Sequence, residues 1–285
     1  MKIIKSISDM QEMSNRLKRA GKRISFVPTM GFLHEGHLRL VDVAKRYGDV
    51  VIVSIFVNPT QFGPKEDLSR YPRDVRGDCS KLSKRGADIV FLPFSKDIYA
   101  EDFQTFVEVN ELQKPLCGKY RPNHFRGVAT IVAKLFNIVM PDYAIFGKKD
   151  YQQFILIKQM VKDLNFPVKI IGVETVRERD RLAMSSRNTY LSVEERETAR
   201  HFAESLYLAS KMYRDGQFRN PSGIIKYVKG YLSQFKEIRV QYVEILDARN
   251  LTEVKDFTQD MVLASAVFVG KTRLIDNRIL KKKCR

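Results

Sequence analysis

The chain has 285 residues, of which 44% are hydrophobic and 29% are charged. This composition is typical of one large or two modest globular domains and excludes an intrinsically disordered chain. Fifty Lys and Arg residues against 33 Asp and Glu residues give a formal net charge of +17. The basic residues are spread along the whole chain, so we interpret them as a solvated surface that favours anionic substrates, and we expect no nucleic-acid partner.

Three scattered cysteines, Cys79, Cys117 and Cys284, give neither a disulfide framework nor the spacing of a zinc site. Reduced thiols in the cytoplasm are the simplest interpretation. The first residues lack the apolar core of a signal peptide, and no apolar stretch approaches the length of a membrane span. We therefore expect a cytoplasmic protein with no membrane partner.

The first strongly predicted strand covers residues 24–27 and ends at Pro28 and Gly31. Helical spacing of apolar residues begins at Glu35, so the HEGH sequence lies where a strand is followed by a helix. Free backbone N–H groups and the positive end of the helix dipole meet at such a junction. The sequence therefore predicts a phosphate site there.

Two histidines, His34 and His37, lie at this junction and share a face if the first turn is helical. Beside a phosphate they can donate charge-assisted hydrogen bonds to oxygens that gain charge during nucleotidyl transfer, and Gly36 leaves room for a nucleotide. A metal site and an ordinary solvated helix are the alternatives, although no further Cys or His lies nearby. A P-loop is excluded because His37 stands where its lysine belongs. We interpret the junction as a nucleotidyl-transfer site.

Buried strands and helices alternate over the next hundred residues. This alternation predicts an α/β fold built on a doubly wound parallel sheet. The loop at 58–63 follows the carboxyl end of a strand, where open α/β sheets bind ligands. Strands are predicted at 49–57, 87–93, 105–109, 142–147 and 168–176, and helices at 70–85 and 128–139.

The character of the sequence changes after residue 176. A charge cluster at 177–181 precedes a helix at 192–208, which starts with a Ser192–Glu195 capping box. A second helix at 222–235 and strands at 240–246 and 261–269 follow. These features predict a smaller α+β domain at 177–285 after a first domain at 1–176.

Several polar residues follow predicted strands or loops. The amides of Gln61 and Gln153 suit the recognition of a hydroxy acid, and Lys149 offers a point charge for a phosphate, although each could be merely solvated. The hydroxyls of Ser185 and Ser186 with the guanidinium of Arg187 form a compact polyphosphate grip. This group resembles the mobile loop of class I aminoacyl-tRNA synthetases. An early HxGH junction and a late loop of this kind are typical of one nucleotidyltransferase superfamily.

Together these motifs closely resemble the pantothenate synthetase (pantoate–β-alanine ligase) family of HxGH nucleotidyltransferases. The resemblance implies a Rossmann-like domain with a smaller C-terminal lid domain, usually in a homodimer. It also implies an ATP-dependent enzyme that condenses pantoate with β-alanine through a pantoyl-adenylate and releases AMP and pyrophosphate. The matching stretches run from end to end of the chain and cover 28–37, 54–74, 121–139, 142–153, 182–188 and 269–277.

The resemblance assigns roles to individual residues. Gln61 and Gln153 match the pantoate-binding glutamines, with Gln61 also near β-alanine, and Asp78 falls where the family has an acidic residue near Mg²⁺. Two departures are Phe32 in place of a commoner alanine and Arg181 in place of a glycine. The groups expected to act on the phosphates during the reaction are His34, His37 (the proton donor), Lys149, Ser185, Ser186 and Arg187. The ATP-binding set is Met30, Gly31, Phe32, Leu33, His34, Glu35, Gly36, His37, Gly147, Lys148, Lys149, Asp150, Val176, Met184, Ser185, Ser186 and Arg187.

Two other functions are weighed against this one. A nucleotidyltransferase that moves AMP or CMP onto a phosphate, such as a pyridine-nucleotide adenylyltransferase, would call for more Arg or Lys around the loop at 58–63. A nucleic-acid-binding protein would need aromatic residues interleaved with a basic patch, and the sequence assembles none.

Overall fold

A computed structural model describes residues 1–64 and 66–282, so Cys284 lies outside the described residues. Its larger sheet is parallel, and the strand order is β1-β4-β3-β2-β5-β6. From β2 the chain proceeds to β3 and β4 on one side, and later to β5 and β6 on the other, which makes the boundary between β2 and β5 the switch point of a doubly wound sheet. The strands are β1 (Lys2–Ile4), β2 (Ile24–Thr29), β3 (Val50–Ile55), β4 (Ile89–Phe91), β5 (Tyr143–Gly147) and β6 (Lys169–Val173).

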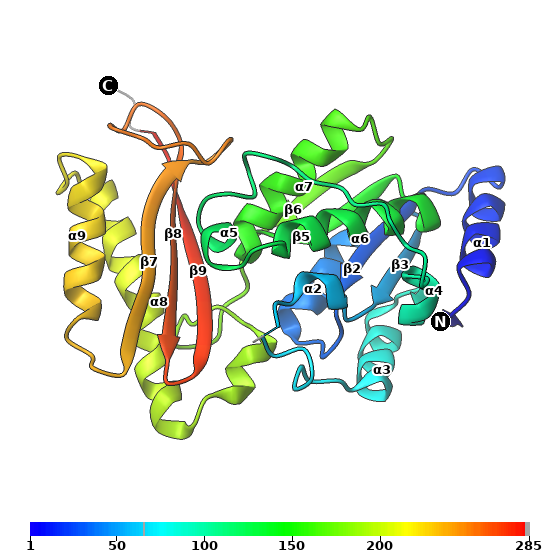
Figure 1. Cartoon of the computed structure of the whole chain (residues 1–285), viewed down its shortest axis with the longest axis horizontal. Coiled ribbons are helices and arrows are strands. Elements are labelled where there is room, and N and C mark those ends of the chain that lie inside the picture. The colour runs from blue at the N-terminus through cyan, green and yellow to red at the C-terminus, as the bar shows by residue number, and fades with distance from the viewer. Residues whose placement is uncertain (65, 283–285) are drawn as a thin grey trace.

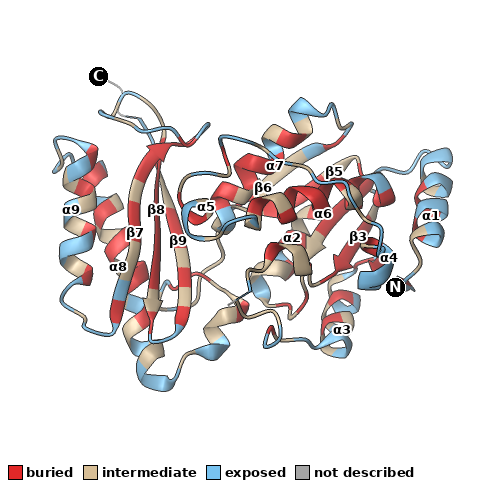
Figure 2. Cartoon of the chain, viewed as in Figure 1, coloured by how far each residue is buried: buried red, intermediate tan, exposed pale blue. Residues whose placement is uncertain are grey.

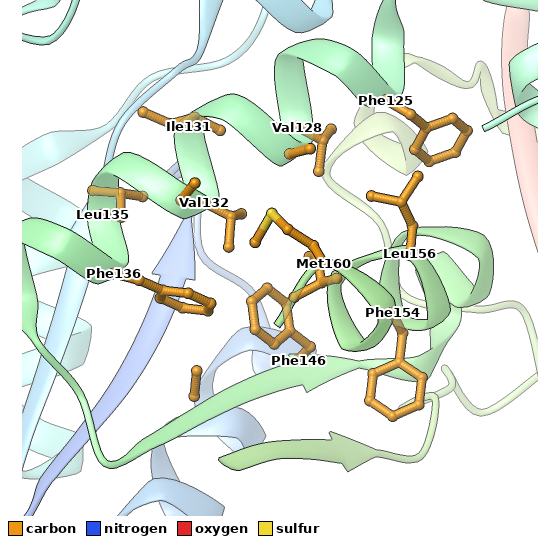
Figure 3. Packing of buried hydrophobic residues seen from close by; sticks show 14 of the residues in the cluster. Phe125, Val128, Ile131, Val132, Leu135, Phe136, Phe146, Phe154, Leu156 and Met160 are labelled. Atoms are coloured by element: carbon orange, nitrogen blue, oxygen red, sulfur yellow. The ribbon is translucent and has the colours of Figure 1, made fainter. Parts of the chain in front are cut away.

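Helices cover both faces of this sheet, which is why its strands are almost continuously apolar. On one face α6 and α7 pack against β5: Val132 of α6, Met160 of α7 and Phe146 of β5 point toward one another (Figure 3). On the other face α2 packs against β5 and α3. The helices of this part are α1 (Ile7–Arg19), α2 (Glu35–Ala44), α3 (Val75–Arg85), α4 (Ser95–Ile98), α5 (Cys117–Tyr120), α6 (His124–Val139) and α7 (Tyr151–Asp163), with 3₁₀ turns η1 (Pro59–Gln61) and η2 (Lys148–Asp150).

The C-terminal part is built on a second, antiparallel sheet of β7 (Ile238–Asp247), β8 (Met261–Val269) and β9 (Thr272–Leu280). Helices α8 (Val193–Arg214) and α9 (Pro221–Leu232) cover one of its faces, while the other face turns toward the first sheet (Figure 1). Tyr242, Leu246 and Val262 on that face join the hydrophobic core of α6 and α7. Burial on both faces explains why the strands of this sheet are largely buried, whereas α8 and α9 expose their outer sides (Figure 2).

The observed architecture confirms the predicted α/β fold with a smaller α+β part. The capping box of α8 is also confirmed, since Ser192 Oγ accepts a hydrogen bond from the Glu195 amide and the Glu195 carboxylate accepts one from the Ser192 amide. Strand β9 was missed, because the sequence analysis predicts no strand after residue 269. Residues 270–271 form the tight turn between β8 and β9, in which Gly270 has a φ of +55°. The domain boundary at residue 177 stays a prediction.

One predicted strand is wrong. Residues 105–109 form no strand, and instead run beside α6, where the Val107 amide donates to Thr130 Oγ1 and the Phe106 ring stacks under the Arg126 guanidinium. The predicted helix at 70–85 begins only at Val75, with Asp74 as its N-cap. None of the helices within the described part of the chain is both long and apolar enough to cross a membrane.

Candidate active site

A cavity lies at the switch point, where the carboxyl ends of β2 and β5 meet the loop before α8. It brings together segments that are more than 150 residues apart in the sequence. Twelve of the expected nucleotide-binding residues line it, together with both expected glutamines. The lining residues predicted from sequence are Met30, His34, Gly36, His37, Gln61, Gly147, Lys149, Asp150, Gln153, Val176, Met184, Ser185, Ser186 and Arg187.

The two histidines cap the start of α2 with their own side chains. Nδ1 of His34 accepts a hydrogen bond from the Gly36 amide at 3.1 Å, and Nδ1 of His37 accepts one from the His34 amide at 3.4 Å. A neutral imidazole that accepts at Nδ1 carries its hydrogen on Nε2. The ring centroids lie 4.1 Å apart, so the pair offers two neighbouring Nε2–H donors to the cavity.

Both imidazoles are neutral at neutral pH in this structure. Burial and the positive charge of Lys149 lower the pKa of His34 to about 4, and burial with the neighbouring His34 holds the pKa of His37 well below its ordinary value. The positive end of the α2 dipole acts in the same direction. A bound polyphosphate would raise both pKa values, so the charge-assisted hydrogen bonds expected from the sequence stay a prediction for the substrate complex.

The sequence predicts free backbone amides before α2, but four of them bind acceptors within the protein. The amides of Phe32 and Leu33 each donate to one carboxylate oxygen of Asp78 at 2.7 Å, and the amides of His34 and Gly36 are capped as described. These four amides are therefore engaged within the protein, and side chains add phosphate-binding groups to the cavity. The imidazoles, Lys149 and the loop at 185–187 supply these groups.

Asp78 does not fit a metal-ligand role. Its side chain is buried at 1% exposure, and both carboxylate oxygens are engaged by amides. Mg²⁺ usually keeps several of its waters when a protein binds it, and this position leaves no room for them. Among the described residues, no group of three or more His, Cys, Asp or Glu side chains is arranged to hold a metal ion.

The serine–arginine loop reaches the same cavity from the C-terminal side. Ser186 Oγ donates to the Phe32 carbonyl at 3.3 Å, which ties this loop to the loop before α2. Ser185 Oγ accepts from the Arg187 amide at 3.3 Å and caps the 3₁₀ turn η3 (Ser186–Tyr190). Arg187 makes a two-point ion pair with Asp67.

The two expected glutamines have different surroundings. Gln61 Nε2 donates to the Met30 sulfur at 3.0 Å, and its Oε1 accepts from Asn58 Nδ2 at 3.1 Å. Asn58 also donates to the Gly127 carbonyl, which fixes the loop at 58–61 against α6. Gln153 faces the cavity on the first turn of α7.

Among the cavity-lining residues to which the sequence analysis gave no role are Asn58, Tyr71, Arg121 and His124. Arg121 binds Glu66 through Nε at 2.7 Å and donates from Nη1 to His124 Nε2 at 3.0 Å. His124 Nδ1 then donates to the Gln61 carbonyl at 2.8 Å, and burial lowers the pKa of His124 to about 3. All four lie within stretches quoted for the family resemblance, which was the only signal that could have found them.

The remaining members of the expected nucleotide set lie outside the cavity wall. Glu35 pairs with Arg85 on the exposed side of α2, and Leu33 is buried in the core. Lys148 pairs with Glu174 and lines a neighbouring cleft. The carbonyls of Lys148 and Lys149 both accept from Asn277 of β9. These hydrogen bonds connect the second sheet to this turn.

The fold and this cavity define a Rossmann-like α/β protein with an HxGH junction at its switch point. The family model described as pantoate-beta-alanine ligase matches residues 2–279. The chain belongs to this family. It is 52% identical to the pantothenate synthetase of Sulfurihydrogenibium sp., covering 97% of this chain and 99% of the relative, and 50% identical to that of Thermotoga neapolitana, covering 98% and 100%.

Solved structures agree with the family assignment. The crystal structure of pantothenate synthetase from Thermus thermophilus superimposes with a TM-score of 0.92 at 40% identity, covering 98% of this chain and 99% of that one. The pantoate-beta-alanine ligase from Francisella tularensis, complexed with beta-gamma ATP and beta-alanine, superimposes with a TM-score of 0.81 at 36% identity, covering 100% and 99%.

Proposed function

We propose that this protein is an ATP-dependent ligase that joins pantoate to β-alanine by way of a pantoyl-adenylate, with release of AMP and pyrophosphate. The observation that carries the proposal is the cavity at the switch point. There the HxGH junction, Lys149 and the Ser185–Ser186–Arg187 loop meet the two glutamines. Family membership and the ATP and β-alanine complex of the Francisella tularensis relative support it.

In the first step the pantoate carboxylate attacks the α-phosphate of ATP in line, and pyrophosphate leaves. The Nε2–H groups of His34 and His37 donate to phosphate oxygens as negative charge develops on them. Lys149 and Arg187 bring positive charge to the departing pyrophosphate. The amides of Gln61 and Gln153 hold pantoate without adding charge.

In the second step the β-alanine amine attacks the acyl carbon of the adenylate, and AMP leaves. The mixed anhydride must be kept from water until then. The second sheet already contacts the turn at Lys149 through Asn277, which is the arrangement that a closing lid needs. We expect the 177–285 part to act as this lid.

Magnesium enters this proposal only with ATP, because phosphate oxygens can supply ligands of their own. A homodimer and a cytoplasmic location also belong to the proposal. Family membership supports both, and the scattered cysteines favour a reducing compartment.

The proposal is tested by measuring AMP and pyrophosphate with ATP, pantoate and β-alanine, omitting each in turn. Sustained AMP release should require all three substrates, and pantothenate should accumulate with it. An adenylyltransferase that needs a phosphate acceptor would release no AMP from this mixture, whichever substrate is omitted. A gel shift of RNA or DNA at physiological salt would support a nucleic-acid-binding protein.

A further inference from the structure

The loop between β2 and α2 has an unusual backbone. Gly31 and Phe32 follow one another with φ values of +84° and +50°, both in the left-handed region. Such conformations are unfavourable for a residue with a side chain and persist where the surroundings hold them. Phe32 therefore needs a restraint, and the next residues along the chain are the HEGH motif.

Asp78 on the first turn of α3 supplies that restraint. Its two oxygens accept from the Phe32 and Leu33 amides at 2.7 Å each, and a Cβ atom built on Gly31 would lie 3.1 Å from Asp78 Oδ2. Lys81, one turn further along α3, donates to the Leu33 carbonyl at 2.7 Å. Helix α3 thus binds the loop through two amides, those of Phe32 and Leu33, and through the Leu33 carbonyl.

The held loop leads to the reacting groups in two directions. Leu33 is followed by His34, the N-cap of α2, whose imidazole lines the cavity. The carbonyl of Phe32 accepts from Ser186 Oγ, and the N–H of the same peptide group, that of Leu33, donates to Asp78. A shift of this loop would displace His34 and Ser186 together.

We infer that Asp78 is a positioning residue for the reaction and does not bind magnesium. It holds the Phe32 and Leu33 amides, and this keeps the side chains of His34 and Ser186 in place to contact the phosphates. The inference rests on the proposed function for its activity readout. Its structural readout, the exchange of the loop amides, is independent of that function.

The test compares Asp78→Asn with Asp74→Asn, the same substitution at the exposed N-cap of α3, where asparagine can still cap. The asparagine at 78 keeps one acceptor but turns an NH₂ group toward the second amide. We expect kcat to fall at least tenfold, hydrogen exchange over 30–34 to accelerate, and the half-saturating Mg²⁺ concentration to stay within twofold of wild type. Asp74→Asn should leave all three nearly unchanged.

Either of two results for Asp78→Asn would overturn the inference. A tenfold rise in the Mg²⁺ requirement of Asp78→Asn, with kcat restored at high Mg²⁺, would make Asp78 a metal ligand. Faster exchange with wild-type kcat and KM values would make the contact structural only. If Asp78→Asn does not fold, Lys81→Met should show a smaller change in exchange and kcat, and wild-type behaviour of that variant would also overturn the inference. Absence of AMP formation by the wild-type protein would refute the proposed function separately.

Discussion

Arg187 and Asp67, which are 120 residues apart in the sequence, form a two-point ion pair at the edge of the cavity. The guanidinium donates from Nε to Oδ2 at 3.0 Å and from Nη2 to Oδ1 at 2.8 Å. Arg187 itself lines the cavity. The pair therefore fixes the plane of the guanidinium before any substrate is bound.

The first prediction concerns this pair. Arg187→Ala should slow adenylate formation about a hundredfold or more, because it removes a planar, permanently charged donor to the phosphates. Arg187→Lys should restore the activity only in part, since a single ammonium cannot reproduce the two-point geometry. Single-turnover kinetics with ATP and pantoate measure this step apart from the attack by β-alanine.

Asp67→Asn tests whether the pair orients Arg187 or obstructs it. If it orients the guanidinium, adenylate formation should slow, though less than in Arg187→Ala. A variant faster than wild type would show that Asp67 competes with the phosphates for Arg187.

The second prediction concerns His37. Removing one preorganised donor to the transition state costs about 3–4 kcal/mol, which corresponds to a rate lower by a factor of about 10²–10³. His37→Ala also removes the acceptor of the His34 amide, so His37→Asn is the matched variant that can keep this cap. Both should lose adenylation activity, while the alanine variant alone loses stability. A rate above about a tenth of wild type in either variant would refute the role.

The third prediction uses two adjacent glutamines. Gln153 faces the cavity, whereas Gln152 is buried, accepting from the Cys117 amide and donating to the carbonyls of Leu112 and Pro115. Gln153→Ala should raise the KM for pantoate and spare ATP affinity, as should Gln61→Ala. Gln152→Ala should chiefly lower the free energy of unfolding, by roughly 1–3 kcal/mol. Calorimetry with ATP checks the assignment, which fails if ATP affinity falls as much as pantoate affinity.

The fourth prediction concerns Arg181, where the resemblance leads us to expect glycine. Its φ is +73°, and its guanidinium lies 3.8 Å from the centroid of the Tyr207 ring. Arg181→Ala keeps the unfavourable backbone and loses the stacking, whereas Arg181→Gly relieves the backbone. The glycine variant should therefore be the more stable of the two by about 1 kcal/mol in chemical denaturation. An alanine variant at least as stable would show that the backbone is not strained there.

The charge cluster at 177–181 forms several ion pairs. Arg177 makes a two-point pair with Asp276, which is 1% exposed at its side chain, and Arg196 binds both Glu178 and Asp180. We expect this segment to be mobile without nucleotide and ordered with ATP. These ion pairs are the contacts that such motion would have to break.

Local pattern was sufficient for the parallel sheet and for the start of α2. Runs of β-branched residues such as 50–55 and the change to helical spacing at Glu35 depend on near neighbours in the sequence. The acceptor that binds the Phe32 and Leu33 amides could not be predicted from near neighbours in the sequence. Asp78 captures them from 46 residues further along the chain, and only the packing of α3 against α2 brings it there.

The same limit applies to the charges in the site. The sequence predicted His34 and Arg187 as site residues, and both line the cavity. The lowered pKa of His34 could not be predicted, because it follows from burial and from the charge of Lys149. Likewise, the ion pair that holds the Arg187 guanidinium depends on Asp67, which is 120 residues away in the sequence. Strand β9 was missed for a different reason: residues 272–280 read TRLIDNRIL, in which polar and apolar residues come in short runs and lack the strict alternation that predicts a strand.

The central claim, a pantoyl-adenylate formed by carboxylate attack on the α-phosphate, is tested most directly with pantoate labelled with ¹⁸O in its carboxylate. The attacking oxygen bridges to phosphorus and leaves with AMP when β-alanine forms the amide. The account predicts that one ¹⁸O per turnover appears in AMP and none in pyrophosphate, by mass spectrometry of the products. Unlabelled AMP, or formation of ADP with labelled inorganic phosphate, would contradict it.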